Sequence, residues 1–255
     1  MDFTQLIYTQ LISQLIERYP IYTVVDFIQK MPEPPFLVLR HDVDLKVERT
    51  LDIARIESEL GIRSTYYFRM VKEIYVPSII TDIAKMGHEV GYHYETVDKA
   101  KGDIKLAKAL FKQELEAFRG LVDVKTVCMH GNSRTEWDNR DLWKTAEMNK
   151  FDLVGEPYLS IDYSDVLYLT DSSRSWDPYR YKILDRVQSD VIPPKVRTTG
   201  ELRQCLQPKR FPKVSLLVHP DEWARSSGQA FIDSIEQGIK NSVKVVIIRK
   251  KGIKR

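Results

Sequence analysis

The chain has 255 residues, of which 43% are hydrophobic and 29% charged, and its 39 basic and 36 acidic side chains leave a formal net charge of +3. This is the composition of an ordinary globular protein, and one domain over 1–255 is the economical prediction because α/β barrels commonly reach this length undivided. Charges of both signs are interspersed, which excludes an electrostatic argument for a nucleic-acid partner.

The N-terminal segment 1–20 predicts neither a targeting signal nor a membrane span. An acid and glutamines interrupt its apolar positions, and no basic region precedes a continuous apolar core. No run approaches the roughly 18 apolar residues that a span needs. Cys128 and Cys205 are then most simply reduced thiols, and a cytoplasmic location is the expectation. The oligomeric state stays open.

The spacing of apolar residues predicts helices and strands along the chain. Apolar spacing over 6–16 predicts an amphipathic helix that ends near Pro20, and we expect residues 1–30 to form a helical extension packed on the domain. Predicted strands, rich in β-branched and aromatic residues, follow at 36–40, 64–70, 88–93, 124–130, 151–156, 166–170, 214–219 and 243–249. Predicted helices lie between them at 48–60, 76–86, 103–118, 139–148, 198–206 and 228–240.

Strands that alternate with helices indicate crossover connections and a parallel sheet. Seven or eight such units favour a distorted (β/α) barrel, closed or nearly closed, over an open doubly wound sheet. The basic end of the chain, RKKGIKR, has two interpretations. We prefer a solvated tail to a contact with an anionic surface.

Polar side chains gather where the predicted strands end. In parallel α/β folds these ends open onto one face, where catalytic groups collect. Three of the five histidines fall there, although a purely structural role would scatter them. The residues at these ends are Asp42 and Asp44, His93 and Glu95, His130 and Asn132, Asp171, and His219 and Asp221.

These residue types suit metal-assisted hydrolysis of an amide or ester. Adjacent carboxylates repel one another, whereas a divalent cation bound by Asp and His, with one open position, holds them together and acidifies water. A carboxylate that is not a ligand can then accept a proton, and a histidine across the rim can protonate the leaving group. Because acids and histidines also form structural networks, spacing alone leaves both interpretations open.

Four short motifs resemble those of the polysaccharide deacetylases, the NodB-homology group of carbohydrate esterase family four. They are RHDVD at 40–44, GHEVGYHYE at 87–95, CMHGNS at 128–133 and LLVH at 216–219. The first is typical of a divergent branch, and the resemblance runs from about residue 36 to 223. It implies a NodB-like barrel with fewer than eight regular units, and a zinc-type divalent metal that serves to remove acyl groups from N-acylated sugars.

The resemblance assigns roles to individual residues. Asp42 matches the catalytic base and Asp44 a metal-binding aspartate. His93 matches a second ligand, and His219 the general acid.

The chain departs from the family pattern in two places. The usual second histidine of the second motif would stand at position 97, where this chain has Val97. His130 and Glu95 are the candidate substitutes, and we favour His130 because imidazole suits zinc and because it ends the neighbouring strand. The family's arginine-proline motif, which orients the base, is also missing, and Arg174 in TDSSRSW is the candidate replacement.

The prediction is therefore a metal-dependent hydrolase, with a divalent metal such as Zn²⁺, that removes an acyl group from an N-acylated sugar or a polysaccharide precursor. One alternative keeps the chemistry but acts on a small soluble amide or a nucleotide-linked sugar. Another is a noncatalytic carbohydrate-binding module with a degenerate metal site. Retention of Asp42 and His219 argues against that module, since binding needs no proton carrier.

Several nearby residues have structural interpretations. Asp42 can simply pair with Arg40. Alternation turns His41 away from the Asp42 face, so a structural hydrogen bond is expected there, and His88 and Glu89 are also expected to be structural. Core packing and stacking on a sugar ring stay equally open for the three tryptophans that follow strand ends, Trp137, Trp176 and Trp223.

Overall fold

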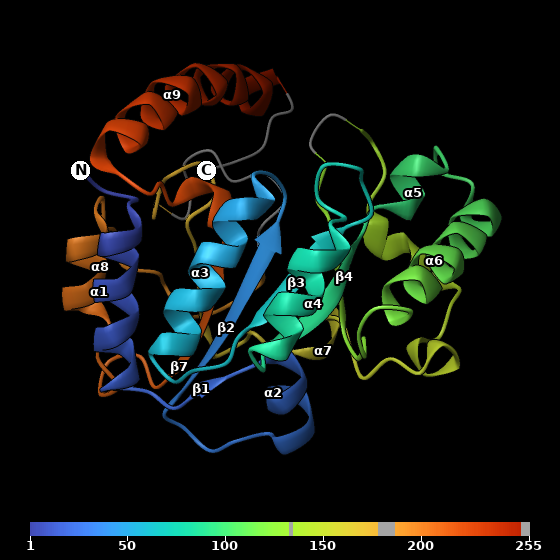
Figure 1. The fold of residues 1–255 in the computed structure, drawn as a ribbon, viewed down its shortest axis with the longest axis horizontal. Helices are drawn as coiled ribbons and strands as arrows, with labels where there is room; N and C mark the ends of the chain where they lie inside the picture. Colours follow the sequence, from blue (N-terminus) through green and yellow to red (C-terminus); the bar gives the residue numbers. More distant parts are fainter. Residues whose placement is uncertain (133–134, 178–186, 251–255) are drawn as a thin grey trace.

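A parallel sheet of seven strands forms the centre of the protein (Figure 1). The computed structural model describes residues 1–132, 135–177 and 187–250, with the backbone alone for 243–250. The strand order is β5-β4-β3-β2-β7-β6, and β1 also pairs with β2. The strands are β1 Ile21–Tyr22, β2 Phe36–Val43, β3 Thr65–Arg69, β4 Glu89–Tyr94, β5 Val127–Met129, β6 Leu167–Thr170 and β7 Lys213–Val218.

The sheet is curled but does not close into a barrel. β5 and β6 end the strand order, and no pairing between them closes the described part of the sheet. The predicted parallel α/β architecture is thus confirmed, whereas the nearly closed barrel of seven or eight units is corrected to a half-barrel.

Two predicted strands are wrong, and each has a local cause. Residues 151–156 begin at the end of the 3-10 helix η2 (Met148–Phe151) and form one isolated bridge, between Gly155 and Thr126, the residue before β5. Glycine weakens a strand, and Pro157 directly afterwards begins a helix. Residues 243–249 belong to the long helix α9 (Ser227–Lys250), because β-propensity takes effect only where a pleated surface offers partners.

Helices surround the sheet, and α3 and α4 run along one of its faces (Figure 1). The predicted helix at 139–148 is instead a 3-10 helix, η1, followed by a break. In the described ranges, no helix is both long enough and apolar enough to cross a bilayer. The remaining bounds are α1 Gln5–Ile16, α2 Val24–Lys30, α3 Val47–Glu59, α4 Pro77–Lys85, α5 Thr96–Lys99, α6 Ile104–Arg119, η1 Asn139–Lys144, α7 Pro157–Ser160, α8 Thr199–Cys205 and η3 Pro220–Glu222.

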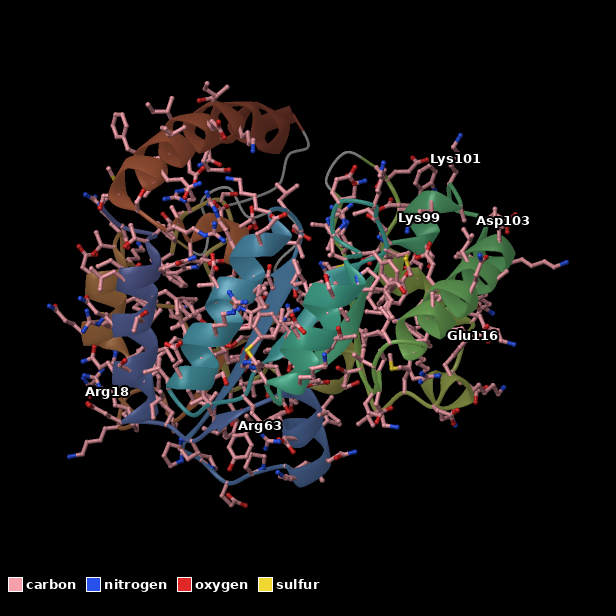
Figure 2. All side chains as sticks on the ribbon, in the orientation of Figure 1. Arg18, Arg63, Lys99, Lys101, Asp103 and Glu116 are labelled. Carbon is pink, nitrogen blue, oxygen red and sulfur yellow. The ribbon has the colours of Figure 1, made fainter. Side chains whose placement is uncertain are left out.

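The first helix packs as its periodicity predicts. Thr4 caps α1 by accepting a hydrogen bond from the backbone of Ile7, and the apolar stripe Tyr8, Leu11, Ile12 and Leu15 is buried. α1 lies beside α8 and α3 (Figure 1). Side chains fill the space between helices and sheet, while charged residues such as Arg63, Lys101 and Asp103 lie at the periphery (Figure 2).

Strand β2 is the central element for function. All eight of its residues are buried, including Arg40, His41 and Asp42. Buried charges need partners, so this strand fixes where ionisable groups from other elements must stand.

Candidate active site

The carboxyl end of β2 presents Arg40 and Asp42 on the face opposite to His41, because successive side chains of a strand alternate. One guanidinium nitrogen of Arg40, Nη1, donates to both oxygens of Asp42, at 2.9 and 3.2 Å. The other, Nη2, lies 3.3 Å from the hydroxyl of Tyr168, and the guanidinium covers the ring of Tyr158 at 4.7 Å. Asp42 is therefore held in one orientation by a buried cation.

Asp44 and two histidines meet just beyond this pair. Nε2 of His93, on β4, lies 3.5 Å from Oδ1 of Asp44 and 3.7 Å from Oδ2 of Asp42. Nε2 of His130, directly after β5, lies 3.7 Å from the same Oδ1. The two imidazole rings are nearly perpendicular, with centroids 5.2 Å apart. Two imidazole nitrogens thus face one carboxylate oxygen.

The protonation of His93 suits a metal ligand. Its Nδ1 lies 3.0 Å from the carbonyl oxygen of Cys128, which can only accept a hydrogen bond, so Nδ1 carries the proton. Burial lowers the pKa of His93 below its ordinary value, against the raising effect of Asp42 and Asp44. The ring is then neutral near pH 7, with the lone pair of Nε2 directed at the carboxylates.

Asp44 supplies the test of whether a cation fits here. Its Oδ1 is buried, and no described residue donates a hydrogen bond to it, which is costly for a carboxylate oxygen. Burial raises the pKa of Asp44, but His130 and His93 lower it to about 2, so the group is ionised. Tetrahedral zinc, with bonds of roughly 2.0–2.1 Å, separates its ligand atoms by about 3.3 Å. The distances from Oδ1 to the two nitrogens are close to that spacing, so these residues fit a divalent cation.

Glu95 lies behind His130, on the side away from Asp44. Its Oε2 is 3.1 Å from Nδ1 of His130 and accepts a hydrogen bond from Nη2 of Arg69 at 2.7 Å. Burial raises the pKa of Glu95, but His130 and Arg69 lower it to about 2. Of the two candidate substitutes, then, His130 faces Asp44 and Glu95 faces His130. A carboxylate on the far nitrogen commonly orients a ligating histidine.

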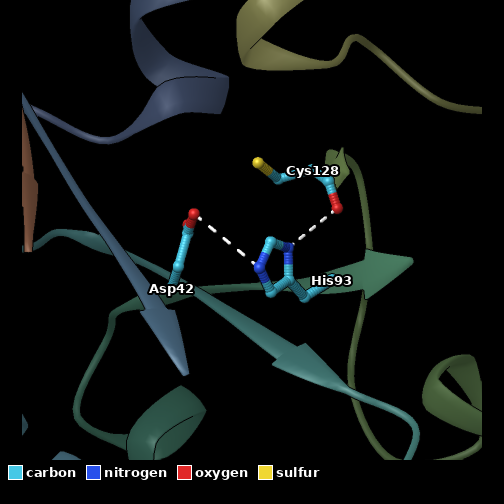
Figure 3. Close-up of side chains that lie close together, drawn as sticks. All are labelled: Asp42, His93 and Cys128. Carbon is cyan, nitrogen blue, oxygen red and sulfur yellow. Dashed lines mark hydrogen bonds and ion pairs between the residues drawn. The ribbon is translucent and has the colours of Figure 1, made fainter. Parts of the chain in front are cut away.

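A second group can be considered for a metal: Asp42, His93 and Cys128, whose potential ligand atoms all lie within 4.8 Å of one another (Figure 3). Nη1 of Arg40 is 2.8 Å from the sulfur of Cys128 and 2.9 Å from Asp42. The positive guanidinium group of Arg40 therefore already lies between Cys128 and Asp42. Burial raises the pKa of the Cys128 thiol well above its usual value, and a thiol must lose its proton to bind zinc. The group around Asp44 is the better candidate.

His219 follows β7 and is oriented by Asp171, which follows β6. Its Nδ1 lies 2.8 Å from Oδ1 of Asp171, whose Oδ2 accepts a hydrogen bond from the indole nitrogen of Trp223 at 2.7 Å. The charge of His219 helps to lower the pKa of Asp44, which places the two groups within electrostatic range. A carboxylate on Nδ1 leaves Nε2 as the nitrogen able to exchange a proton with a substrate.

Further carboxyl groups crowd this rim. Burial, together with Asp44 and Asp171, raises the pKa of Asp221 to about 6, against the lowering effect of His219. Burial and Asp221 raise the pKa of Glu222 to about 8. Carboxylates crowded in this way favour a cation among them.

Arg174 does not orient the base, which corrects the sequence prediction. In the described structure it donates to the backbone oxygens of Glu222 and Ala230, and Asp42 is paired by Arg40 instead. Ser173 and Arg174 both have positive φ, 65° and 52°, so the chain turns sharply within this loop and Arg174 lies away from Asp42. The pair of Asp42 with Arg40, weighed as a structural alternative, is real.

The expected structural residues behave as predicted. His41 pairs with Glu57 through Nε2 at 2.9 Å, His88 binds backbone atoms of Ser64 and Ala54, and Glu89 accepts from Thr65. Trp176 and Trp223 are buried, so neither stacks on a sugar, and Trp137 packs partly against the core.

Sequence reasoning missed Arg69 and Cys128 as neighbours of the site, and it named Arg40 only as a structural partner of Asp42. The alternation of RHDVD places Arg40 beside Asp42, because positions 40 and 42 share one face. The register of β4 against β5 pairs His93 with Cys128, and that of β3 against β4 pairs Arg69 with His93. No signal within the sequence fixes those registers.

The solved structures that the chain matches include proteins of carbohydrate esterase family 4. The catalytic domain of a peptidoglycan N-acetylglucosamine deacetylase from Eubacterium rectale is 15% identical, covers 82% of this chain and 86% of its own, and has a TM-score of 0.45. A family 4 carbohydrate esterase from Bacillus subtilis is 13% identical, covers 91% and 83%, and has a TM-score of 0.43. A family 4 pseudoenzyme from Bacillus anthracis is 15% identical, covers 81% and 61%, and has a TM-score of 0.42.

These are likenesses of fold at low sequence identity. No family model and no curated protein sequence matches the chain. At these identities and TM-scores, and with a pseudoenzyme among the similar structures, the chemistry of this chain has to come from its own residues.

Proposed function

We propose that the protein is a metal-dependent hydrolase of C–N bonds that removes an acyl group from an N-acylated sugar. Asp44, His93 and His130 would hold a divalent cation of the Zn²⁺ type. The observation that carries the proposal is the buried Oδ1 of Asp44, with no hydrogen-bond donor among the described residues and two imidazole nitrogens at 3.5 and 3.7 Å.

When bound, such a cation supplies a Lewis acid that polarises the acyl carbonyl and makes a water molecule more acidic. Asp42 is suited to accept the proton of that water. Its carboxylate faces the same histidine as Asp44, and Arg40 fixes its orientation from the other side. Asp42 is then a proton acceptor, although it lies near the ligands.

His219 is suited to donate a proton to the leaving nitrogen. Asp171 on its Nδ1 stabilises the imidazolium form and fixes the tautomer. As the water oxygen bonds to the acyl carbon, Asp42 takes one water proton, and His219 protonates the nitrogen as the C–N bond breaks. The products are a carboxylic acid and a free amine, and the water supplies all the atoms gained.

The proposed substrate class rests on the motif resemblance. The structurally similar peptidoglycan deacetylase described above is named for N-acetylglucosamine, an N-acylated sugar. A small soluble amide remains the second substrate class, since it needs the same groups. A noncatalytic sugar-binding module would not need Asp42 and His219 both to be oriented by partners, as they are here.

Metal content and amine release together test this proposal. Protein purified without chelators is expected to carry about one zinc-type ion per chain and to release amine from N-acetyl or N-formyl sugars. Removal of the metal with a chelator should abolish release, and addition of Zn²⁺ should restore it. The exposed Asp82 on α4 offers a matched control, since Asp82→Asn leaves the site untouched.

Each alternative has its own result in this assay. If the protein binds metal and releases amine from small amides but from no sugar, the substrate is a small amide and not an N-acylated sugar. Sugar binding without metal or turnover would establish the module and refute the hydrolase.

A further inference from the structure

Helix α9 turns its polar side toward the protein and its apolar side outward. Its inward positions are Ala230, Asp233, Gln237 and Asn241. The outward positions Phe231, Ile232, Ile235 and Ile239 are between 54% and 67% exposed. A surface helix ordinarily buries its apolar stripe, so this orientation is the reverse of the usual one. We call these four outward residues the α9 stripe.

Specific polar contacts hold the helix in this orientation. Asp233 pairs with Lys46 at 2.9 Å and with Arg49 at 2.7 Å. Asn241 donates to the backbone oxygen of Ser173 at 3.3 Å. Rotating the stripe inward would deprive Lys46 and Arg49 of their carboxylate and bury Phe231 against these charges. The protein therefore keeps the stripe exposed.

The charge of the chain indicates what covers the stripe. The last sixteen residues, KNSVKVVIIRKKGIKR, contain seven basic and no acidic side chains. An exposed apolar helix face followed by clustered lysines and arginines is the combination that binds anionic lipid surfaces. The exposed side chains of the α9 stripe therefore reverse the preference for a solvated tail that the basic residues alone suggested. A second copy of the chain would bring an equal positive charge to the contact, which disfavours self-association.

We propose that α9 docks on an anionic membrane surface, with the α9 stripe inserted among the lipids. This is surface binding and not spanning, since no described helix is both long enough and apolar enough to cross a bilayer. Lys46, which anchors α9 through Asp233, is two residues beyond Asp44. Docking would therefore bring the rim of the sheet close to the lipid surface (Figure 1).

The test is cosedimentation of the full chain with vesicles of phosphatidylcholine alone or with added phosphatidylglycerol. We expect binding to the anionic vesicles, weakened by high salt. The double variant Phe231→Ser with Ile235→Ser should bind at least about tenfold more weakly, because two inserted apolar side chains are lost. Leu106→Ser, at an exposed leucine on α6, is the matched control and should bind like the parent.

Other outcomes overturn the proposal. These are no binding to anionic vesicles, or equal binding by the parent and by a double variant whose circular dichroism is native. A dimer seen by light scattering that dissociates in the double variant would show that a second copy covers the stripe. Metal content is measured separately, so failure here leaves the hydrolase proposal standing.

Discussion

Two clusters in this protein each combine a carboxylate with two histidines, but within the described ranges only one of the two carboxylates has its hydrogen bonds satisfied. At the rim, Asp44 faces His93 and His130, and its Oδ1 receives no hydrogen bond from any described residue. On the other face of β2, Glu57 lies between His41 and His88. Glu57 accepts hydrogen bonds from Tyr8, Ser64 and Tyr66, and with Nε2 of His41 each of its two oxygens has two partners.

The difference shows that residue types alone do not define a site. A carboxylate surrounded by donors is complete and stabilises the fold, whereas a buried oxygen left among imidazole nitrogens has capacity for a ligand. Strand β2 supplies both clusters, because alternation sends His41 to one face and Asp42 to the other.

The largest effect is expected from Asp42→Asn. The amide cannot accept the proton, so kcat should fall by about a hundredfold to ten-thousandfold. Because Asp42 is not one of the three proposed ligands, the metal content should stay at the wild-type level. Loss of metal together with activity would instead move Asp42 into the ligand set.

Glu57→Gln breaks the other cluster. The amide leaves His41 without its carboxylate, and the free energy of unfolding in urea should fall by about 3–5 kcal/mol. Metal bound per folded chain should not change. If the variant lost its metal while remaining folded, the two clusters would not be independent.

The same cluster predicts acid sensitivity. Burial raises the pKa of Glu57, but His41 and His88 lower it to about 2, below the value of about 4.3 in an unfolded chain. Its contribution, up to roughly 3 kcal/mol, is complete above pH about 5 and lost as the pH falls toward 2. Urea unfolding at several pH values should show this slope in the parent and not in Glu57→Gln; a matching slope in both would assign it to other groups.

Burial also lowers the pKa of His88, so the folded chain resists protonation there. Since an unfolded histidine takes up its proton near pH 6.5, His88 adds a second loss of stability as the pH falls below that value. Both groups act in the same direction.

A smaller effect is expected from Glu95→Gln at the rim. The carboxylate lies 3.1 Å from Nδ1 of His130, although the two do not align as a hydrogen bond, and it is not one of the proposed ligands. Affinity for Zn²⁺ should therefore fall by about ten- to a hundredfold without being abolished. Isothermal titration with the metal-free protein measures it. Complete loss of binding would make Glu95 a ligand.

Much of the fold and site follows from local pattern. The parallel sheet and the meeting of Asp44, His93 and His130 could be predicted, because side chains that end parallel strands share one edge whatever the connections between them. His41 could be assigned to the opposite face for a similarly local reason, the alternation of a strand.

The failures come from tertiary context. Arg174 was misplaced because two residues with positive φ turn its loop, which the serines of TDSSRSW do not announce. Residues 243–249 have β-branched composition but continue a helix, since composition does not say whether a sheet edge is available. The open sheet likewise depends on how far β5 and β6 stand apart, which no local pattern encodes.

Elemental analysis of the parent and of Asp44→Asn, both purified without chelators, tests the central claim most directly. The parent should contain about one divalent ion per chain, and the variant, folded by circular dichroism, should contain essentially none. Equal metal in both proteins, or none in the parent after Zn²⁺ is supplied, would contradict the assignment of Asp44 as a ligand.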